Sequence, residues 1–300
     1  MVKSFRIVRE EETALLVEKI RSASVVNLSD MLLSLTNNVL CRVAMGRKYW
    51  EGDASNEEGV LEKVAREFDE FIEAVVAEHI DRKRRECNNG RGSGEKEVND
   101  FLDVLLELQS DDRAGFPIHR DTIKALTLDM FAAGTDTIFT VLEWTMAELL
   151  KHTEFMKKLQ KEVRDVGRGK RYIAEDDLEK MHYLKAVIKE SPRLHTPAIA
   201  RDPSSWEDPE EFRPERFLNS SIDFKGKGFE FIPFGAGRRG CPGIVFAVNV
   251  IELALANIVY RFDFCLPDGA RLEDLDTMSE RTGTTIHKKN PLIVLAAEHL

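Results

Sequence analysis

Apolar side chains recur at the helical spacing of three or four residues through roughly the first two-thirds of the chain. The pattern predicts amphipathic helices, which we place at residues 28–43, 59–85, 100–109, 120–151 and 181–195. A polar, glycine-rich stretch at 87–97, CNNGRGSGEKE, predicts a loop between the second and third of them. We find no internal repeat, and the pattern as a whole predicts a mainly α-helical fold.

The longest predicted helix has a weak turn at its centre, in FAAGTDTIFT at 131–140. Gly134 costs roughly 1 kcal/mol relative to alanine inside a helix, and Thr135 and Thr137 are mediocre helix formers. Two interpretations stay open at the level of these residues. The turn has a functional role, or Gly134 simply admits a neighbouring helix close to its backbone.

The helix expected at 181–195 carries Glu190 and Arg193, which lie three residues apart and therefore on one face. Pro192 stands between them, and a proline inside a helix removes a backbone hydrogen bond at a cost of about 3 kcal/mol. We therefore expect either a kinked helix or a weakened pair. After it, DPSSWEDPEEFRPERF at 202–217 is rich in prolines and aromatics, which predicts an irregular meander.

The most apolar run, at 244–260, has nearly the length of a membrane span. Asn249, Glu252 and Asn257 would each be costly in lipid, so we interpret the run as a buried helix of a soluble core. The amino terminus, MVKSFRIVREEETALL, opens on a charged helical pattern without the apolar core of a signal peptide. The sequence thus predicts neither an anchor nor a targeting segment.

Composition adds limits on partners. The 300 residues are 43% hydrophobic and 32% charged, which is typical of a globular protein. A net charge of −10 argues against a general nucleic-acid binder. Four separated cysteines without a CxxC pair indicate neither a zinc site nor a disulfide framework. Of these, Cys41 and Cys265 lie in apolar patterns and are expected to be buried.

The stretch FGAGRRGCPG at 234–243 supports two interpretations. Through Gly235, Gly237 and Gly240 it spells the G-x-G-x-x-G turn of a dinucleotide-binding oxidoreductase, with Asp263 as the ribose-binding acid. Pro233 would interrupt the required central strand, and no strand–helix alternation precedes it. We therefore expect no dinucleotide site here.

Through its cysteine, the same stretch predicts a metal-ligating thiolate. Pro242 would occupy the first position of the following helix, where its missing N–H costs nothing. The helix dipole and free N–H groups favour thiolate over thiol at Cys241. Gly237, Gly240 and Gly243 would let the backbone approach a large flat ligand, and Arg239 would be available to a carboxylate of that ligand.

The residues resemble a known family at four ordered motifs. FGAGRRGCPG fits F-x-x-G-x-R-x-C-x-G and is similar to the haem-binding loop of cytochromes P450. AGTDT at 133–137 matches their oxygen-activation motif, Glu190-x-x-Arg193 their E-x-x-R helix, and PERF at 214–217 their meander. The segments SLTNNVLCRVAMGRKY and DFLDVLLELQ look most like those of plant microsomal members that oxidise specialised metabolites.

The resemblance implies a single partial cytochrome P450 domain over 1–300, mainly α with little residual β-sheet. It also implies haem b as cofactor and the following residue roles. Cys241 would be the proximal iron ligand, Phe234 and the loop glycines Gly237 and Gly243 would lie against the haem, and Arg239 would pair with a propionate. In the long helix, Asp136 and Thr137 would relay protons at the turn loosened by Gly134. Glu190, Arg193 and Arg216 would form a buried ion network under the haem.

The activity implied is haem-thiolate monooxygenation of a small apolar or aromatic molecule, with electrons from NADPH through NADPH–cytochrome P450 reductase. Lys225, Lys227, Arg238 and Arg239 cluster in sequence around this loop. Either they form a positive face that would steer that reductase, or they are scattered solvated charges. Full-length relatives are expected on the cytosolic face of the endoplasmic reticulum membrane. This chain, without an anchor, is expected in the cytosol.

The chain also departs from the family pattern. Its first residues correspond to a point beyond the membrane anchor and early helices of such proteins. Its sequence also runs directly from Pro197 to Ile199, at a place where such proteins have several strands. These departures support an alternative: a truncated, catalytically dead remnant that retains the motifs. We accordingly expect no turnover from the chain as written, because haem chemistry needs water excluded.

Overall fold

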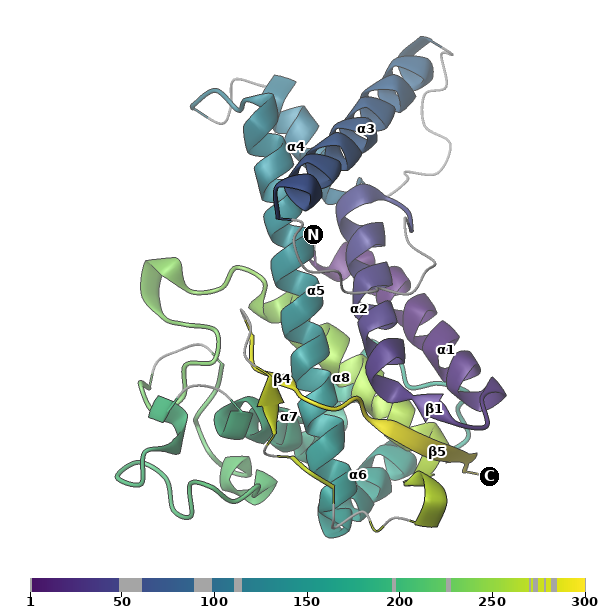
Figure 1. The fold of residues 1–300 in the computed structure, drawn as a ribbon, viewed down its shortest axis with the longest axis vertical. Coiled ribbons are helices and arrows are strands. Elements are labelled where there is room, and N and C mark those ends of the chain that lie inside the picture. Colours follow the sequence, from purple (N-terminus) through teal and green to yellow (C-terminus); the bar gives the residue numbers. More distant parts are fainter. Residues whose placement is uncertain are drawn as a thin grey trace. The chain divides into compact units, whose positions relative to one another are not determined.

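The computed structural model describes residues 2–48, 61–88, 99–110, 115–195, 198–224, 228–269, 271, 275–277, 279–281 and 285–299. Helices dominate these ranges (Figure 1). The α-helices are α1 (Arg6–Ser22), α2 (Leu28–Met45), α3 (Leu61–Asn88), α4 (Phe101–Ser110), α5 (Arg120–Lys151), α6 (Thr153–Val166), α7 (His182–His195) and α8 (Ile244–Arg261). The mainly α fold class is confirmed, and the five predicted helices correspond to α2, α3, α4, α5 and α7.

Strands are few and all described pairs are antiparallel. A three-stranded sheet has the order β1 (Val26–Asn27), β5 (Ile293–Glu298), β2 (Phe262–Cys265), and a second pair joins β3 (Glu280–Arg281) to β4 (His287–Lys288). Among the described residues there is thus no parallel sheet, and residues 229–234 form no strand. This excludes the dinucleotide-binding arrangement, as expected.

The chain divides into two compact units, one of Met1, Lys3–Val8 and Asn37–Thr135 and the other of Val2, Arg9–Thr36 and Asp136–Leu300. The first unit buries the facing apolar sides of α3, α4 and the ends of α2 and α5 in one cluster, which includes Met45, Val76, Leu105 and Ile123. The single domain expected over 1–300 stays a prediction.

The second unit is built on α6, α7 and α8. The prediction that the apolar run at 244–260 is buried is confirmed, because α8 is buried over most of its length. Its Asn257 is satisfied inside the core: the side-chain amide donates to the Ile173 carbonyl at 3.0 Å and accepts from the Ile173 N–H at 2.9 Å. Such bonds explain how a polar residue fits an apolar helix.

Length and hydropathy would allow two helices in the described chain, α5 and α8, to cross a membrane. In α8 the most apolar window is 61% buried within the structure, as in the core helix of a globular protein, whereas in α5 the buried share is 17%.

One burial prediction is confirmed and one is wrong. Cys41 is buried in α2, but Cys265 is exposed at the end of β2. Side chains alternate between the two faces of a strand, and Phe262 occupies the buried face, so the residue three positions later points outward.

Candidate active site

The thiolate loop, residues 232–243, is closed by short backbone bonds ahead of α8. The Cys241 N–H donates to the Phe234 carbonyl at 2.8 Å, and the Gly240 N–H donates to the Gly237 carbonyl at 3.1 Å. Gly235 and Gly237 have φ of 70° and 67°, which lies in the left-handed region that favours glycine. The glycine spacing is therefore a requirement of the turn that presents Cys241.

Cys241 is exposed and lies just before α8. Its Sγ accepts a hydrogen bond from the Gly243 N–H at 3.3 Å. Gly243 is the N-cap of α8 and Ile244 its first residue, so the prediction that Pro242 begins the helix is wrong. The turn that brings the Gly243 N–H to the sulfur precedes the helix and contains Pro242.

An aromatic cluster lies beneath this loop. The half-buried Phe234 meets Phe224 edge to face, with ring centroids 5.4 Å apart at 86°. Phe224 in turn contacts Phe231, which is buried against Phe217 and Trp206 of the meander. The loop is thus supported by the segment that the PERF motif belongs to. Arg238 and Arg239 are exposed on the loop itself.

Glu190, Arg193 and Arg216 are brought together by α7 and the meander. Arg193 donates to both oxygens of Glu190, from Nε at 2.7 Å and from NH2 at 2.9 Å. Arg216 Nε donates to the same carboxylate at 3.0 Å. Glu190 and Arg193 are fully buried. α7 continues as a helix through Pro192, and both bonds of the Glu190–Arg193 pair are formed. Of the two expected outcomes, a weakened pair is not observed, and a kink in the helix stays a prediction.

The two arginines also bind the backbone of the meander. Arg193 donates to the carbonyls of Ala200, Pro209 and Glu211, at 3.0, 2.7 and 3.0 Å. Arg216 donates to the carbonyl of Glu207 at 2.8 Å. Carbonyls that an irregular segment would otherwise leave unpaired are thereby satisfied. The network fixes the course of residues 200–217.

The AGTDT turn of α5 falls at the boundary between the two units. In the first unit, a Cβ on Gly134 would overlap the Leu40 side chain of α2, which favours the interpretation that this glycine admits a neighbouring helix. The hydroxyl of Thr135 is buried and has no hydrogen-bond partner among the described residues. Thr137 is exposed.

In the second unit, Asp136 contacts a segment far away in sequence. Its Oδ1 lies 3.1 Å from Nε2 of His287, and its Oδ2 accepts a hydrogen bond from Thr285. Sequence reasoning missed Thr285 and His287. Thr285 lies just before β4 and His287 is its first residue, and nothing local indicates a partner that is 149 residues away from Thr285.

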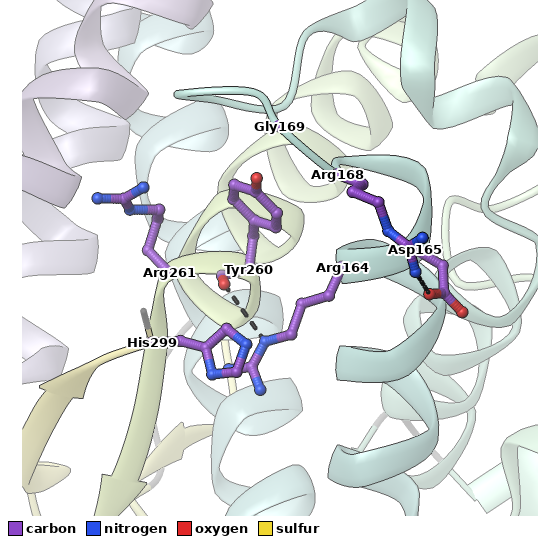
Figure 2. A pocket seen from close by; sticks show the side chains of 7 residues that line it. All are labelled: Arg164, Asp165, Arg168, Gly169, Tyr260, Arg261 and His299. Carbon is purple, nitrogen blue, oxygen red and sulfur yellow. Dashed lines mark hydrogen bonds and ion pairs between the residues drawn. The ribbon is translucent and has the colours of Figure 1, made fainter.

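A pocket of about 370 Å³ lies at the ends of α6 and α8 and contains none of the expected site residues (Figure 2). Its arginines each have a carboxylate partner: Arg168 pairs with Asp165 at 3.3 Å, Arg164 with Asp263 at 2.9 Å, and Arg261 with Glu298. Figure 2 shows Arg164 directed at the Tyr260 carbonyl.

A second group that sequence reasoning missed is His79, Asp100 and Asp103 in the first unit, whose candidate ligand atoms lie within 4.8 Å of one another. Arg82 donates to both oxygens of Asp103, at 2.8 and 2.7 Å, and His79 Nε2 lies 2.8 Å from Asp100. The positive charge that a metal ion would bring to these aspartates is already supplied by protein side chains, so the group is a buried salt-bridge cluster.

Known proteins are similar to this chain over nearly its whole length. A sequence model of the family described as "Cytochrome P450" matches residues 52–199 and 196–294. "Cytochrome P450 71A2" of Solanum melongena is 46% identical over 98% of this chain and 71% of its own length. "Psoralen synthase" of Pastinaca sativa is 44% identical over 96% of this chain and 72% of its length. A solved zebrafish cytochrome P450 superposes with a TM-score of 0.81 over 99% of this chain and 78% of its own, at 23% identity.

The comparisons also locate an interruption. The alignment to the Solanum melongena protein runs over 362 positions, more than the 300 residues of this chain. That relative therefore has internal stretches without a counterpart here. The two matched segments of the family meet at 196–199, where the sequence passes from Pro197 to Ile199. Pro197 lies outside the described residues. With a family match over most of its length and relatives above 40% identity, the chain belongs to the cytochrome P450 family.

Proposed function

We propose that this chain holds a haem-thiolate site, with Cys241 as the proximal ligand, of the kind that serves monooxygenation of a small apolar or aromatic molecule. The observation that carries the proposal is the exposed Cys241 sulfur, which is presented by a glycine turn at the start of an 18-residue helix and accepts the Gly243 N–H.

The residues present fit haem b. A side-chain atom added at Gly237 would meet nothing within 4 Å, so the loop leaves open space on the side of that glycine. Arg239 is exposed and would pair with a haem carboxylate, and Phe234 would lie beside the macrocycle. When bound, haem supplies the iron whose thiolate ligand favours O–O cleavage.

The protein's own part is ligation, orientation and proton supply. The bond from the Cys241 N–H to the Phe234 carbonyl holds the sulfur in one position, and the Gly243 N–H stabilises its negative charge. On α5, Asp136 and Thr137 would hold protons and pass them on. Both side chains are open to solvent, so the aspartate can be reprotonated from water.

Partners follow from the same proposal. Electrons would come from NADPH through NADPH–cytochrome P450 reductase, at the cytosolic face of the endoplasmic reticulum. Arg238 and Arg239 are exposed beside the thiolate and would attract an acidic partner. Lys225 and Lys227, which we also expect to contribute, lie outside the described residues. Relatives include a psoralen synthase and a norfluorocurarine oxidase, and we extend to this chain only oxidation of a small molecule.

A second candidate function is a haem-thiolate remnant that does not complete the reaction. The interruption at 196–199 favours it. Water that reaches the reacting centre diverts activated oxygen and weakens every electrostatic contact there. For the chain as it stands, we expect haem binding without turnover.

Haem titration of the purified chain tests the ligation. We expect saturation at one haem per chain with the absorbance of a thiolate complex, and loss of that spectrum in Cys241→Ser. Cys265→Ser is the matched control, since Cys265 is also exposed but lies at the end of a strand. Equal loss in both variants, or no loss in Cys241→Ser, would refute the assignment.

A further inference from the structure

A buried histidine joins α3 to the start of α4 in the first unit. His79 of α3 and Asp100, the residue that precedes α4, are both buried. Nε2 of His79 lies 2.8 Å from Asp100 Oδ2. Nδ1 lies 2.8 Å from the carbonyl oxygen of Val75, one turn earlier in α3. Each ring nitrogen therefore has a partner at hydrogen-bond distance.

These two partners are of the kind that accept hydrogen bonds. A carbonyl oxygen has no proton to give, so Nδ1 carries the hydrogen of the bond to Val75. An ionised carboxylate likewise only accepts, so beside an ionised Asp100 the Nε2 atom carries a hydrogen as well. No hydroxyl group, which could act in either sense, takes part in these two bonds. Only an imidazolium has both N–H groups.

The other contacts of Asp100 favour its ionised form. Its Oδ1 accepts the Asp103 N–H at 2.8 Å, and its own N–H donates to Asp103 Oδ2 at 3.4 Å, which is the reciprocal pattern of a helix capping box. Arg82 lies 3.8 Å from Asp100 Oδ2 and also binds Asp103. An N–H donor and a nearby guanidinium both stabilise a carboxylate. The proton between Nε2 and Oδ2 therefore belongs to His79.

Charges from α3 and α4 surround the ring: Asp100, Asp103, Arg82 and Lys83. The chain that follows α2 also approaches, because an added Cβ on Gly46 would lie 2.7 Å from Asp100 Oδ2. The next residue, Arg47, pairs with Glu78 of α3 at 2.7 Å. Burial alone would lower the pKa of His79, but the hydrogen bond to Asp100 and its negative charge outweigh burial and raise that pKa above 6.5.

We infer that His79 and Asp100 form a pH-operated clasp, in which the imidazolium holds the N-cap of α4 against α3 and its deprotonation releases that end of α4. On deprotonation the Nε2–H bond breaks and the proton passes to water, which leaves a ring lone pair facing a buried carboxylate. Two buried acceptors that face each other cannot form a hydrogen bond. Because the pKa is raised, the clasp is complete below pH 6.5 and opens as pH rises through the raised pKa.

Nitrogen NMR of the full chain with ¹⁵N-labelled histidine tests the protonation state without haem. Seven histidines give few signals, and His79 is assigned by its loss in His79→Gln. At pH 6.5 we expect both ring nitrogens to show imidazolium shifts. Asp100→Asn should give a neutral ring protonated at Nδ1, because the asparagine amide can donate to Nε2 while Val75 still needs the Nδ1–H. Asp81→Asn, at an exposed acid of α3, is the matched control and should change nothing.

Amide hydrogen exchange tests the clasp itself. The protection factor of the Asp103 N–H, which corrects for the pH dependence of exchange in an open chain, should fall by roughly tenfold as pH rises through the titration of His79. His79→Gln should remove this pH dependence, since a glutamine amide does not titrate.

An unprotonated ring nitrogen of His79 in the wild-type chain at pH 6.5 would overturn the inference. A protection factor that stays constant through the titration, or that falls equally in His79→Gln, would overturn the clasp. Should Asp100→Asn fail to fold, the titration of the wild-type ring and the exchange of His79→Gln still decide. None of these measurements depends on haem, so the proposed function and the clasp fail separately.

Discussion

At the scale of single residues, two buried glutamates of the second unit have opposite protonation behaviour. Burial raises the pKa of Glu252 in α8 from 4.5 to about 7, because Lys185 and Lys189 only partly compensate its desolvation. Burial acts in the same direction on Glu148 of α5, but hydrogen bonds from His152 and His195 outweigh it and lower that pKa to about 2. One carboxyl therefore costs stability at neutral pH and the other contributes it.

Replacement of Glu252 by glutamine should stabilise the chain above pH 7. Between pH 4.5 and 7 the folded state binds more protons than the unfolded state, so the glutamate lowers the free energy of unfolding as pH rises, by on the order of 3 kcal/mol in full. Urea unfolding at pH 8 and pH 4.5 should show the gain only at pH 8. Glu179→Gln, at an exposed position, is the control, and a pH-independent gain would contradict the account.

Replacement of Glu148 by glutamine should have the reverse effect. A pKa of about 2 means that the ionised carboxylate contributes stability above pH 4.5, which is lost as pH falls toward 2. We expect a loss on the order of 3 kcal/mol at pH 7 that shrinks on acidification. Thermal unfolding across this range measures it. If the variant were as stable as wild type at pH 7, the two histidine bonds would not have the assigned strength.

At the scale of elements, the helical period of apolar residues was sufficient to locate helices, because burial of one face determines where each of them lies. The helical period did not predict side-chain exposure or the start of a helix where these depend on position within a turn or strand. Cys265 is exposed because strand alternation overrides an apolar neighbourhood, and Pro242 precedes α8 because the turn around Cys241 needs the Gly243 N–H. Pro192 leaves the Glu190–Arg193 pair intact, since the arginine's bonds extend into the meander.

That network provides the prediction for α7. Arg193→Met should leave the Glu190 carboxylate buried with reduced compensation and should destabilise the chain by about 3–5 kcal/mol. Arg213→Met is the matched control, because the Arg213 side chain forms an exposed pair with Asp208 and should cost less than about 1 kcal/mol. Chemical denaturation measures both. Similar small losses would mean that the network contributes little to stability.

At the scale of the whole molecule, the motifs identified the family, but the contacts between distant segments could not be predicted. Thr285 contacts Asp136 across 149 residues and His287 lies two residues further on, and no local pattern encodes such a contact. The interruption at 196–199 could be recognised from the sequence alone, because too few residues separate two of the family motifs. Its consequence for catalysis depends on how the haem would be enclosed.

We expect the chain to give no product from small aromatic or terpenoid substrates with NADPH and reductase, even with haem bound. Relatives have internal stretches that this chain lacks at 196–199, so a bound haem would be less enclosed and water would reach the reacting groups. Product analysis beside a full-length relative measures this. Product from this chain that disappears in Cys241→Ser would contradict the expectation and establish a working monooxygenase.

The most direct test of the central claim is the carbon-monoxide difference spectrum of the reduced, haem-loaded chain. If Cys241 is the proximal thiolate, wild type and Cys265→Ser should both give the long-wavelength band of a thiolate–haem complex, and Cys241→Ser should lose it. A thiolate band that persists in Cys241→Ser, or a wild-type spectrum without that band, would contradict the assignment of Cys241 as the haem ligand.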